Sequence, residues 1–313
     1  MQSNELNKSK RTSRLVLGTA QLGMNYGISN KTGQPDLETA EMIVKTAWEA
    51  GVCEFDTAQA YGQSEQVLGR CLKNIGITNK AKIISKLDLN IDHLDRAALS
   101  SALTRSLHDL EIQSLYGLML HKEDMLDLWA TRLESSFMGM VDSGRVGHVG
   151  VSVYSPQKAI QALNIESISM VQLPTNIMDR RFEKAEVFDL AEDTGKTIYI
   201  RSIFLQGLLL MSPDCLPQHM RFAAPVLNKL ALLAQDVGLN TMELCIGYIK
   251  HTFPHSMFVF GAETQAQVKE NIEGWDVLWP SELAQEIQTE FRDVDEIILN
   301  PSLWLKGNNN KRP

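Results

Sequence analysis

Short apolar runs alternate with amphipathic stretches about eight times along this chain. The apolar runs predict strands near 14–20, 51–56, 81–86, 114–121, 147–152, 168–173, 196–202 and 256–261. Between them, apolar residues recur at helical spacing and predict helices over 37–50, 64–75, 95–109, 123–143, 156–163, 181–194, 222–237 and 264–272. Strict alternation of strand and helix predicts a parallel sheet with helices packed outside it.

Residues with known preferences for helix ends support these boundaries. Asp36 and Thr264 can cap the first and last of these helices, and Ser155 places a hydroxyl before Pro156 at a first helical position. Asn240-Thr-Met-Glu243 is typical of a capping box and predicts a further helix to about residue 250. Glycines that tolerate a left-handed backbone follow four helical segments, at Gly51, Gly144, Gly195 and Gly238.

Eight strand-helix units fit both a closed barrel and an open doubly wound sheet. The open dinucleotide-binding sheet carries GxGxxG after its first strand, but residues 17–24 read Leu-Gly-Thr-Ala-Gln-Leu-Gly-Met. The sequence also lacks the Walker A, GxSxG and HExxH patterns, which excludes the usual phosphotransfer, serine-hydrolase and zinc-protease classes. We therefore predict an α/β protein with a (β/α)8 TIM barrel.

Length and composition allow a large core. The chain has 313 residues, of which 44% are hydrophobic, and a single barrel takes about 250 residues. We predict one domain, with a flexible N-terminal segment at 1–12, the catalytic barrel at 13–280, and a C-terminal helix and tail at 281–313. The helix is expected over 281–298 with Ser281 as its cap.

Charge and cysteine spacing restrict the kinds of binding partner and the cellular compartment that we expect. The net charge of -8 gives no basic field, so nucleic acid is not an expected partner. The N-terminus lacks an apolar signal region, and no run of about 18 apolar residues occurs. We expect a cytoplasmic protein without a membrane partner. The four cysteines form no CxxC pair and indicate neither zinc nor disulfides, and the oligomeric state stays open.

Four polar residues end successive apolar runs or follow them closely: Asp56, Tyr61, Lys86 and His121. Each alone is more often structural than functional, but in a parallel barrel all four would meet at the carboxyl edge, where chemistry is housed. A buried Lys86 needs an anion nearby, for which Asp56 is the candidate. Together they predict carbonyl reduction, with a phenol protonating the oxygen as hydride reaches the carbon.

With these residues, the chain resembles the aldo-keto reductases from about Leu15 to Trp275, most strongly in Gly51-Val-Cys-Glu-Phe-Asp-Thr-Ala-Gln-Ala-Tyr-Gly62. The resemblance implies that Tyr61 is the general acid/base and that Lys86 lowers its pKa. It further implies that Asp56 holds Lys86 and that His121 orients or polarises the carbonyl. No metal is implied.

The resemblance also implies a nicotinamide cofactor, NADPH with NADH possible. Ser152 and Gln172 match residues that bind the carboxamide, and Glu270 and Asn271 match the pair that holds the adenine. The loops 202–207 and 261–264 occupy the places where a barrel binds phosphate. The implied cofactor contacts are Gly18, Thr19, Asp56, Ser152, Gln172, Arg201, Ser202, Gly207, Gly261, Glu270 and Asn271.

Departures from the family pattern concern the same cofactor. Val153 replaces the usual asparagine, and Arg201 replaces a tyrosine that stacks on the nicotinamide. The cationic clamp for the 2′-phosphate is replaced by Gly261, Ala262 and Gln267, which puts NADP preference in doubt. Lys269 is near in sequence, but two helical positions from Gln267 it is expected to face elsewhere.

Substrate and alternative functions follow from weaker signals. Tyr26, Phe204, Trp275 and Trp279 are candidates for the rim, and helix soon after His121 predicts a shallow pocket for a small aldehyde or a sugar-like carbonyl. One alternative is a regulatory subunit that senses redox state through bound nicotinamide. Another is a metal-dependent lyase, which lacks support because no carboxylate/His cluster occurs at the strand ends.

Overall fold

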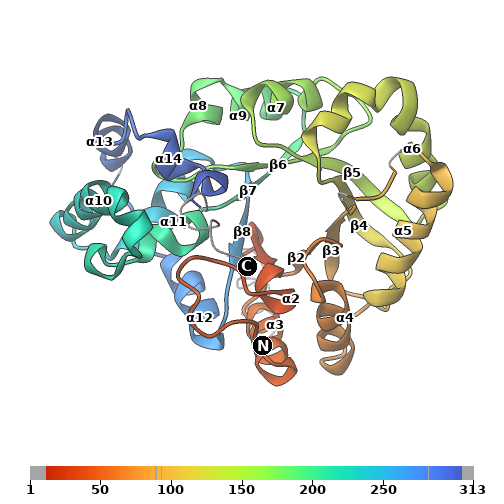
Figure 1. Cartoon of the computed structure of the whole chain (residues 1–313), viewed down its shortest axis with the longest axis horizontal. Coiled ribbons are helices and arrows are strands. Elements are labelled where there is room, and N and C mark those ends of the chain that lie inside the picture. Colours follow the sequence, from red (N-terminus) through yellow and green to blue (C-terminus); the bar gives the residue numbers. More distant parts are fainter. Residues whose placement is uncertain (1–11, 89, 93, 281, 305–313) are drawn as a thin grey trace, which may run out of the picture.

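The computed structural model describes residues 12–88, 90–92, 94–280 and 282–304, and in this part of the chain eight parallel strands close into a barrel (Figure 1). All eight predicted strands are confirmed, with shifts of a few residues at their ends. Their bounds are β1 Leu15–Gly18, β2 Glu54–Asp56, β3 Lys82–Lys86, β4 Leu115–Leu120, β5 Val146–Ser152, β6 Met170–Pro174, β7 Thr197–Arg201 and β8 Met257–Gly261.

Pairing between the first and last strands decides between the closed barrel and the open sheet. Strand β1 pairs with β2 on one side and with β8 on the other, in a register that runs from Leu15 opposite Phe258 to Gly18 opposite Gly261. The Arg14 guanidinium reinforces this seam by donating to the carbonyl oxygens of Phe253 at 3.0 Å and Pro254 at 2.6 Å. The predicted TIM barrel is therefore confirmed.

Helices surround the strands (Figure 1). The α-helices are α2 Ala20–Gly23, α3 Leu37–Glu49, α4 Ser64–Asn74, α5 Arg96–Asp109, α6 Glu134–Asp142, α7 Pro156–Leu163, α8 Arg181–Lys184, α9 Val187–Asp193, α10 Ala224–Asp236, α11 Thr241–Thr252, α12 Gln265–Gly274, α13 Leu283–Glu290 and α14 Glu296–Leu299. The 3-10 helices are η1 Glu123–Leu128, η3 Leu205–Leu210, η4 Pro213–Cys215, η5 Gln218–Ala223 and η6 Pro301–Leu303, and η2 Trp129–Leu133 is a π-helix.

The barrel interior is filled by side chains. Inward-facing apolar residues form a small cluster of Val16, Ile84, Met119, Met170, Tyr199 and Val259. Gly117 makes room for the cluster, because a Cβ at this position would lie 2.8 Å from the Met170 sulfur. A larger cluster lies between the strands and the helices and forms the main core. Since the interior is packed, a ligand can enter only at the ends of the barrel.

Most predicted helix caps are confirmed. The Asp36 and Thr264 side chains accept hydrogen bonds from the third residues of α3 and α12, and Asn240 and Glu243 form the predicted capping box of α11. All four of the predicted C-terminal glycines have positive φ. The prediction for Ser155 is wrong, because its hydroxyl does not cap α7 and contacts the Glu123 carboxylate at 3.4 Å instead.

Three predicted helices are broken in the structure. The stretch 123–143 begins as η1, passes through the π-helix η2 and becomes α-helical only in α6. The stretch 181–194 divides into α8 and α9, because Glu186 adopts a left-handed conformation with φ 56°. The stretch 281–298 divides into α13 and α14 around Phe291, whose φ and ψ are not helical. The helical spacing of apolar residues continues through each break, so the sequence pattern predicted one continuous helix in each case.

The segment after the barrel packs back onto it. Arg180 donates to the carbonyl oxygen of Gln288 in α13, and Lys229 of α10 pairs with Glu290 at 2.5 Å. Trp304 is buried. The predicted cap Ser281 and most of the flexible segment 1–12 lie outside the described residues, but Thr12 is buried. Among the helices that are described, none has the length and apolar character to cross a membrane.

Candidate active site

The four residues singled out from the sequence lie at the carboxyl end of the barrel. Asp56 ends β2, Lys86 ends β3, and His121 directly follows β4. Tyr61 lies in the loop before α4, in a turn where the next residue, Gly62, has φ 59°. A Cβ at Gly62 would lie 2.3 Å from the carbonyl oxygen of Gly23, so only glycine fits this turn. The structure therefore brings the four side chains together.

Lys86 and Asp56 form a buried ion pair. The Lys86 ammonium donates to both carboxylate oxygens of Asp56 at 2.7 Å and to the carbonyl oxygen of Thr57 at 3.0 Å. The Lys86 side chain is 0% exposed and that of Asp56 is 5% exposed. Burial lowers the pKa of Lys86, and the adjacent Asp56 carboxylate opposes this effect. The pair places one ammonium under the phenol without leaving an unpaired buried charge.

The phenol of Tyr61 lies above this ion pair. Its oxygen is 3.5 Å from the Lys86 nitrogen, and the ammonium lies 5.0 Å from the ring centre. Burial and the negative charge of Asp56 raise the pKa of Tyr61, and the positive charge of Arg201 lowers it. The net direction differs from the expectation that Lys86 lowers this pKa, because burial of the phenol has the largest effect and the Asp56 carboxylate adds to it. A raised pKa keeps the phenol protonated, as a proton donor requires.

His121 faces Tyr61 in a neutral form. The two rings are 5.8 Å apart and nearly perpendicular, at 84°. Burial and the positive charges of Lys86 and Arg201 lower the pKa of His121 to about 3. Its Nδ1 atom is buried and has no hydrogen-bond partner among the described residues. A neutral imidazole carries a single N–H, which can donate to a carbonyl oxygen placed between His121 and Tyr61.

The lowered pKa of His121 makes stability sensitive to acid. The folded pKa of about 3 lies below the ordinary value of 6.5, so between these pH values the unfolded chain binds more protons and stability falls as pH falls. From pH 7 to pH 4.5 we expect His121 to account for about 2–3 kcal/mol of lost unfolding free energy. Urea unfolding of wild type and His121→Gln at both pH values measures this difference.

A matched control separates this effect from the titration of other groups. His108 is 85% exposed at its side chain, so His108→Gln should show the same acid sensitivity as wild type. Equal pH dependence of wild type and His121→Gln would contradict the assignment of a neutral buried imidazole.

An elongated cleft runs from Tyr61 along the ends of β1, β7 and β8. This cleft, here termed the β8 cleft, has a volume of about 240 Å³. All but two of the cofactor contacts predicted from the sequence line it, namely Gly18, Thr19, Asp56, Arg201, Ser202, Gly207, Gly261, Glu270 and Asn271. Tyr61 and Asn271 both line the cleft, so a ligand that fills it would contact both.

Several features of the β8 cleft fit a bound dinucleotide. The loop after β7 holds Ser202, Leu205 and Gln206 at positive φ, a strained arrangement that is common where a backbone meets a ligand. The Oδ1 atom of Asn271 is buried without a partner in the described structure and could accept a bond from an adenine amino group. The glycines at 18 and 261 let a ligand approach the strand ends closely.

The remaining two predicted contacts do not line the cleft. Ser152 ends β5 and is buried. Gln172 is buried in β6 and donates to Asp56 at 2.8 Å, while its Oε1 atom has no partner among the described residues. That free acceptor suits the amide N–H of a carboxamide. Lys269 is exposed and does not line the cleft, as its spacing from Gln267 predicted.

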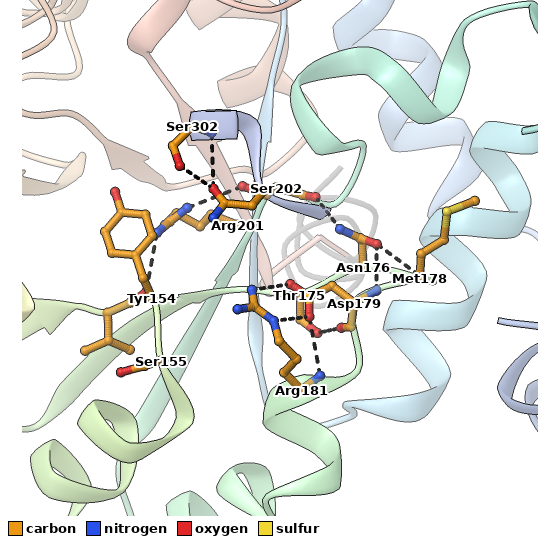
Figure 2. Close-up of polar contacts among 12 residues, drawn as sticks. Tyr154, Ser155, Thr175, Asn176, Met178, Asp179, Arg181, Arg201, Ser202 and Ser302 are labelled. Carbon is orange, nitrogen blue, oxygen red and sulfur yellow. Dashed lines mark hydrogen bonds and ion pairs between the residues drawn. The ribbon is translucent and has the colours of Figure 1, made fainter. Parts of the chain in front are cut away.

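A second, larger cavity opens on the other side of Tyr61. It has a volume of about 980 Å³ and is here termed the polar cavity. Its lining includes Tyr26, Tyr61, His121, Ser152, Tyr154, Asn176, Asp179, Arg181, Arg201, His219, Asn300, Ser302 and Trp304. Figure 2 shows several of these side chains and their contacts. Tyr61 and Arg201 line both the polar cavity and the β8 cleft and so stand where the two meet.

The walls of this cavity differ from those predicted. The C-terminal segment Leu299–Trp304 supplies part of the lining, a wall that the sequence did not predict. Tyr26 and Phe204 line one or both cavities, as expected, but Trp275 is a core residue and Trp279 packs against the core. We did not predict Trp304 as a lining residue from the sequence, nor Tyr154 and Asn176, although both of these closely follow predicted strands.

Comparisons with known proteins agree with this geometry. The Aldo/keto reductase family model matches residues 14–289. The Bacillus subtilis aldo-keto reductase YhdN is 24% identical over 84% of this chain and 86% of its own length, and the Escherichia coli L-glyceraldehyde 3-phosphate reductase is 25% identical over 87% and 89%.

Another relative has a different name, and a solved structure of an aldo/keto reductase also matches this chain. A probable voltage-gated potassium channel subunit beta from rice is 24% identical over 86% of this chain and 91% of its own length. The structure of a Klebsiella pneumoniae aldo/keto reductase in complex with NADP and acetate superimposes with a TM-score of 0.70, at 16% identity over 89% and 91% of the two chains. The family model covers most of the chain, and the protein therefore belongs to the aldo/keto reductase family.

Proposed function

We propose that this protein reduces an aldehyde or ketone to an alcohol with NAD(P)H, using Tyr61 as the proton donor. The observation that carries the proposal is the position of the Tyr61 phenol. It lies above the Lys86–Asp56 ion pair, beside the neutral His121 ring, and where the β8 cleft meets the polar cavity. A carbonyl group in the polar cavity can reach this phenol and a cofactor in the β8 cleft at once.

Each member of the site has a separate task in this reaction. The bound cofactor supplies the hydride that the carbonyl carbon receives. Tyr61 gives its proton to the carbonyl oxygen, and the His121 N–H orients that oxygen. Lys86 lies 3.5 Å from the phenol oxygen and stabilises the negative charge left on it, while Asp56 keeps Lys86 charged and in place.

The residues that would hold the cofactor follow from the cleft. The Gln172 Oε1 atom and the Ser152 hydroxyl would bind the carboxamide near Tyr61. The loop Ser202–Gly207 would hold the phosphates through its backbone N–H groups. Glu270 and Asn271 would bind the adenine at the far end of the β8 cleft.

A screen of cofactors against carbonyl compounds tests the proposal. Absorbance of the reduced nicotinamide is followed with NADPH or NADH and a panel of small aldehydes, ketones and aldoses. We expect oxidation of the cofactor that depends on the carbonyl compound and persists in a metal chelator. A panel without turnover for either cofactor would contradict the proposal.

A second candidate is a regulatory subunit that binds the nicotinamide and senses its redox state. The relationship to a probable potassium channel subunit from rice favours this candidate. Such a subunit would bind NADPH without needing rapid turnover. Tight cofactor binding combined with the absence of carbonyl-dependent oxidation would support it over the reductase.

Discrimination between NADPH and NADH should be weak. Among the charged residues that line the β8 cleft, Asp56, Glu263 and Glu270 are acidic, and the single basic residue is Arg201. A charged contact to the 2′-phosphate contributes about 1.5–3 kcal/mol, so its absence costs about ten- to a hundredfold in preference. The ratio of kcat/KM for the two cofactors measures the preference, and a ratio above about a thousandfold would contradict this prediction.

Introducing a cation into the β8 cleft tests the same prediction about cofactor preference in the opposite direction. Gln267 lines the β8 cleft, so Gln267→Arg should raise the preference for NADPH by about tenfold or more. Lys269→Gln provides the matched control, because Lys269 is exposed and does not line the cleft. Its preference should equal that of wild type.

A further inference from the structure

The polar cavity has an uncompensated positive charge. Its lining contains one aspartate and two arginines, Asp179, Arg181 and Arg201. Arg181 and Asp179 neutralise each other through two bonds of 2.9 and 2.8 Å between guanidinium and carboxylate. Arg201 pairs with no carboxylate in the part of the chain that the structure describes. The net charge on the wall of the cavity is therefore that of Arg201.

The guanidinium of Arg201 keeps most of its donors available. Its contacts to the Val153 carbonyl oxygen and the Ser202 hydroxyl are both long, at 3.4 Å. Its main support is the ring of Tyr154, whose centre is 4.4 Å away (Figure 2). Stacking on a ring occupies the face of a guanidinium and leaves the N–H groups at its edge free to bind an anion.

The backbone that carries the Tyr154 ring is held in place by hydrogen bonds. The backbone N–H groups of Tyr154 and Ser155 donate to one carboxylate oxygen of Glu123 at 2.6 and 3.1 Å. Glu123 belongs to η1, which closely follows β4 and His121. The backbone of Tyr154 is thus tied to the end of the barrel where His121 lies, while the residue as a whole is 51% exposed and open to the cavity.

Arg201 is also close to the reacting groups. Its charge lowers the pKa values of both Tyr61 and His121. The carbonyl oxygen of a substrate would lie between those two side chains, and the rest of the molecule would extend into the polar cavity past Arg201. An anionic group a few bonds from the carbonyl carbon would then meet the guanidinium.

We infer that Arg201 binds a carboxylate or phosphate group of the substrate, and that the protein acts on acidic carbonyl compounds in preference to neutral ones. This inference rests on the proposed reductase function. It replaces a small neutral aldehyde by an anionic substrate, because an uncharged molecule would leave the Arg201 donors in the cavity without partners.

Substrate pairs that differ only in charge test the inference. Butanal is compared with 4-oxobutanoate, and L-glyceraldehyde with L-glyceraldehyde 3-phosphate, so that the two pairs distinguish carboxylate from phosphate. We expect kcat/KM to favour the anionic member of at least one pair by about ten- to a hundredfold. Equal kcat/KM within both pairs would overturn the inference and leave the reductase function intact.

Variants assign the selectivity to this side chain. Arg201→Gln should reduce the anionic-to-neutral ratio of kcat/KM about ten- to a hundredfold, and Arg201→Lys should retain more of it. Arg221→Gln removes the same charge from an exposed residue that does not line the cavity, and should retain the ratio of wild type. If Arg201→Gln weakens cofactor binding and leaves the ratio unchanged, Arg201 serves the cofactor and the inference is wrong.

Calorimetry supplies a readout that does not depend on turnover. With the cofactor bound, 4-hydroxybutanoate and L-glycerol 3-phosphate are titrated into wild type and Arg201→Gln, with butanol and glycerol as neutral counterparts. We expect saturable binding of at least one anion to wild type and its loss in Arg201→Gln. Anion binding in the absence of any carbonyl turnover would reject the reductase function but retain the anion site, and no anion binding to wild type would reject the site.

Discussion

Replacing Tyr61 by phenylalanine should lower kcat by about 10²–10⁴-fold, the usual contribution of a positioned proton donor. The variant retains the ring beside His121 and loses only the hydroxyl above Lys86. Cofactor affinity should change little, because the phenol proton takes part in the chemical step. Steady-state kinetics together with fluorescence titration of NADPH measure the two effects separately.

A matched substitution is available in the same cavity. Tyr26 lines both the β8 cleft and the polar cavity but is not one of the four site residues predicted from the sequence. Tyr26→Phe should therefore cause a much smaller loss of kcat than Tyr61→Phe. If Tyr61→Phe turns over at nearly the wild-type rate, another group donates the proton and the assignment fails.

Breaking the buried ion pair should have the largest effect on stability. Lys86→Met leaves the Asp56 carboxylate buried without its cation, and removal of one partner of a buried pair typically costs about 3–5 kcal/mol. Replacing both partners removes the unpaired charge. The double variant Asp56→Asn/Lys86→Met should therefore lose less unfolding free energy than the two single variants added together.

Urea unfolding of the four proteins completes this double-mutant cycle. The side-chain amide that Asp56→Asn introduces still offers Gln172 an acceptor oxygen, so the loss of that hydrogen bond does not complicate the comparison. Losses that add within about 0.5 kcal/mol would show that Lys86 and Asp56 are not coupled. Both single variants should also have low activity, since each removes a group that acts on Tyr61.

The sequence was sufficient to predict the barrel and the positions of the four site residues in it, for a common physical reason. A buried strand in a parallel barrel is a short apolar run, and the first polar residue after it must lie at the carboxyl edge. His121 follows this rule, and Asp56 and Lys86 are themselves the last residues of β2 and β3. Closure of the barrel was predicted only from the missing GxGxxG pattern, because alternation of strands and helices is the same in an open sheet.

Other parts of the site depend on contacts that no local pattern contains. The wall formed by Leu299–Trp304 comes from a segment that folds back over the barrel from beyond its last strand. The stacking of Arg201 on Tyr154 joins the end of β7 to the loop after β5, which is distant in sequence. The direction of the Tyr61 pKa shift depends first on how deeply the phenol is buried and then on the charge of Asp56, which only the folded structure reveals.

The seam between β1 and β8 has a consequence for how the protein is made. Strand β1 is synthesised before β8, so its apolar residues Leu15, Val16 and Leu17 have no partner on one side until β8 has left the ribosome. Gly18 and Gly261 are paired neighbours that both line the β8 cleft, so a chain without β8 contains no complete cleft. Between the synthesis of β1 and that of β8, the nascent protein therefore carries an open strand edge, and a ligand of the cleft can stabilise it only after β8 has emerged.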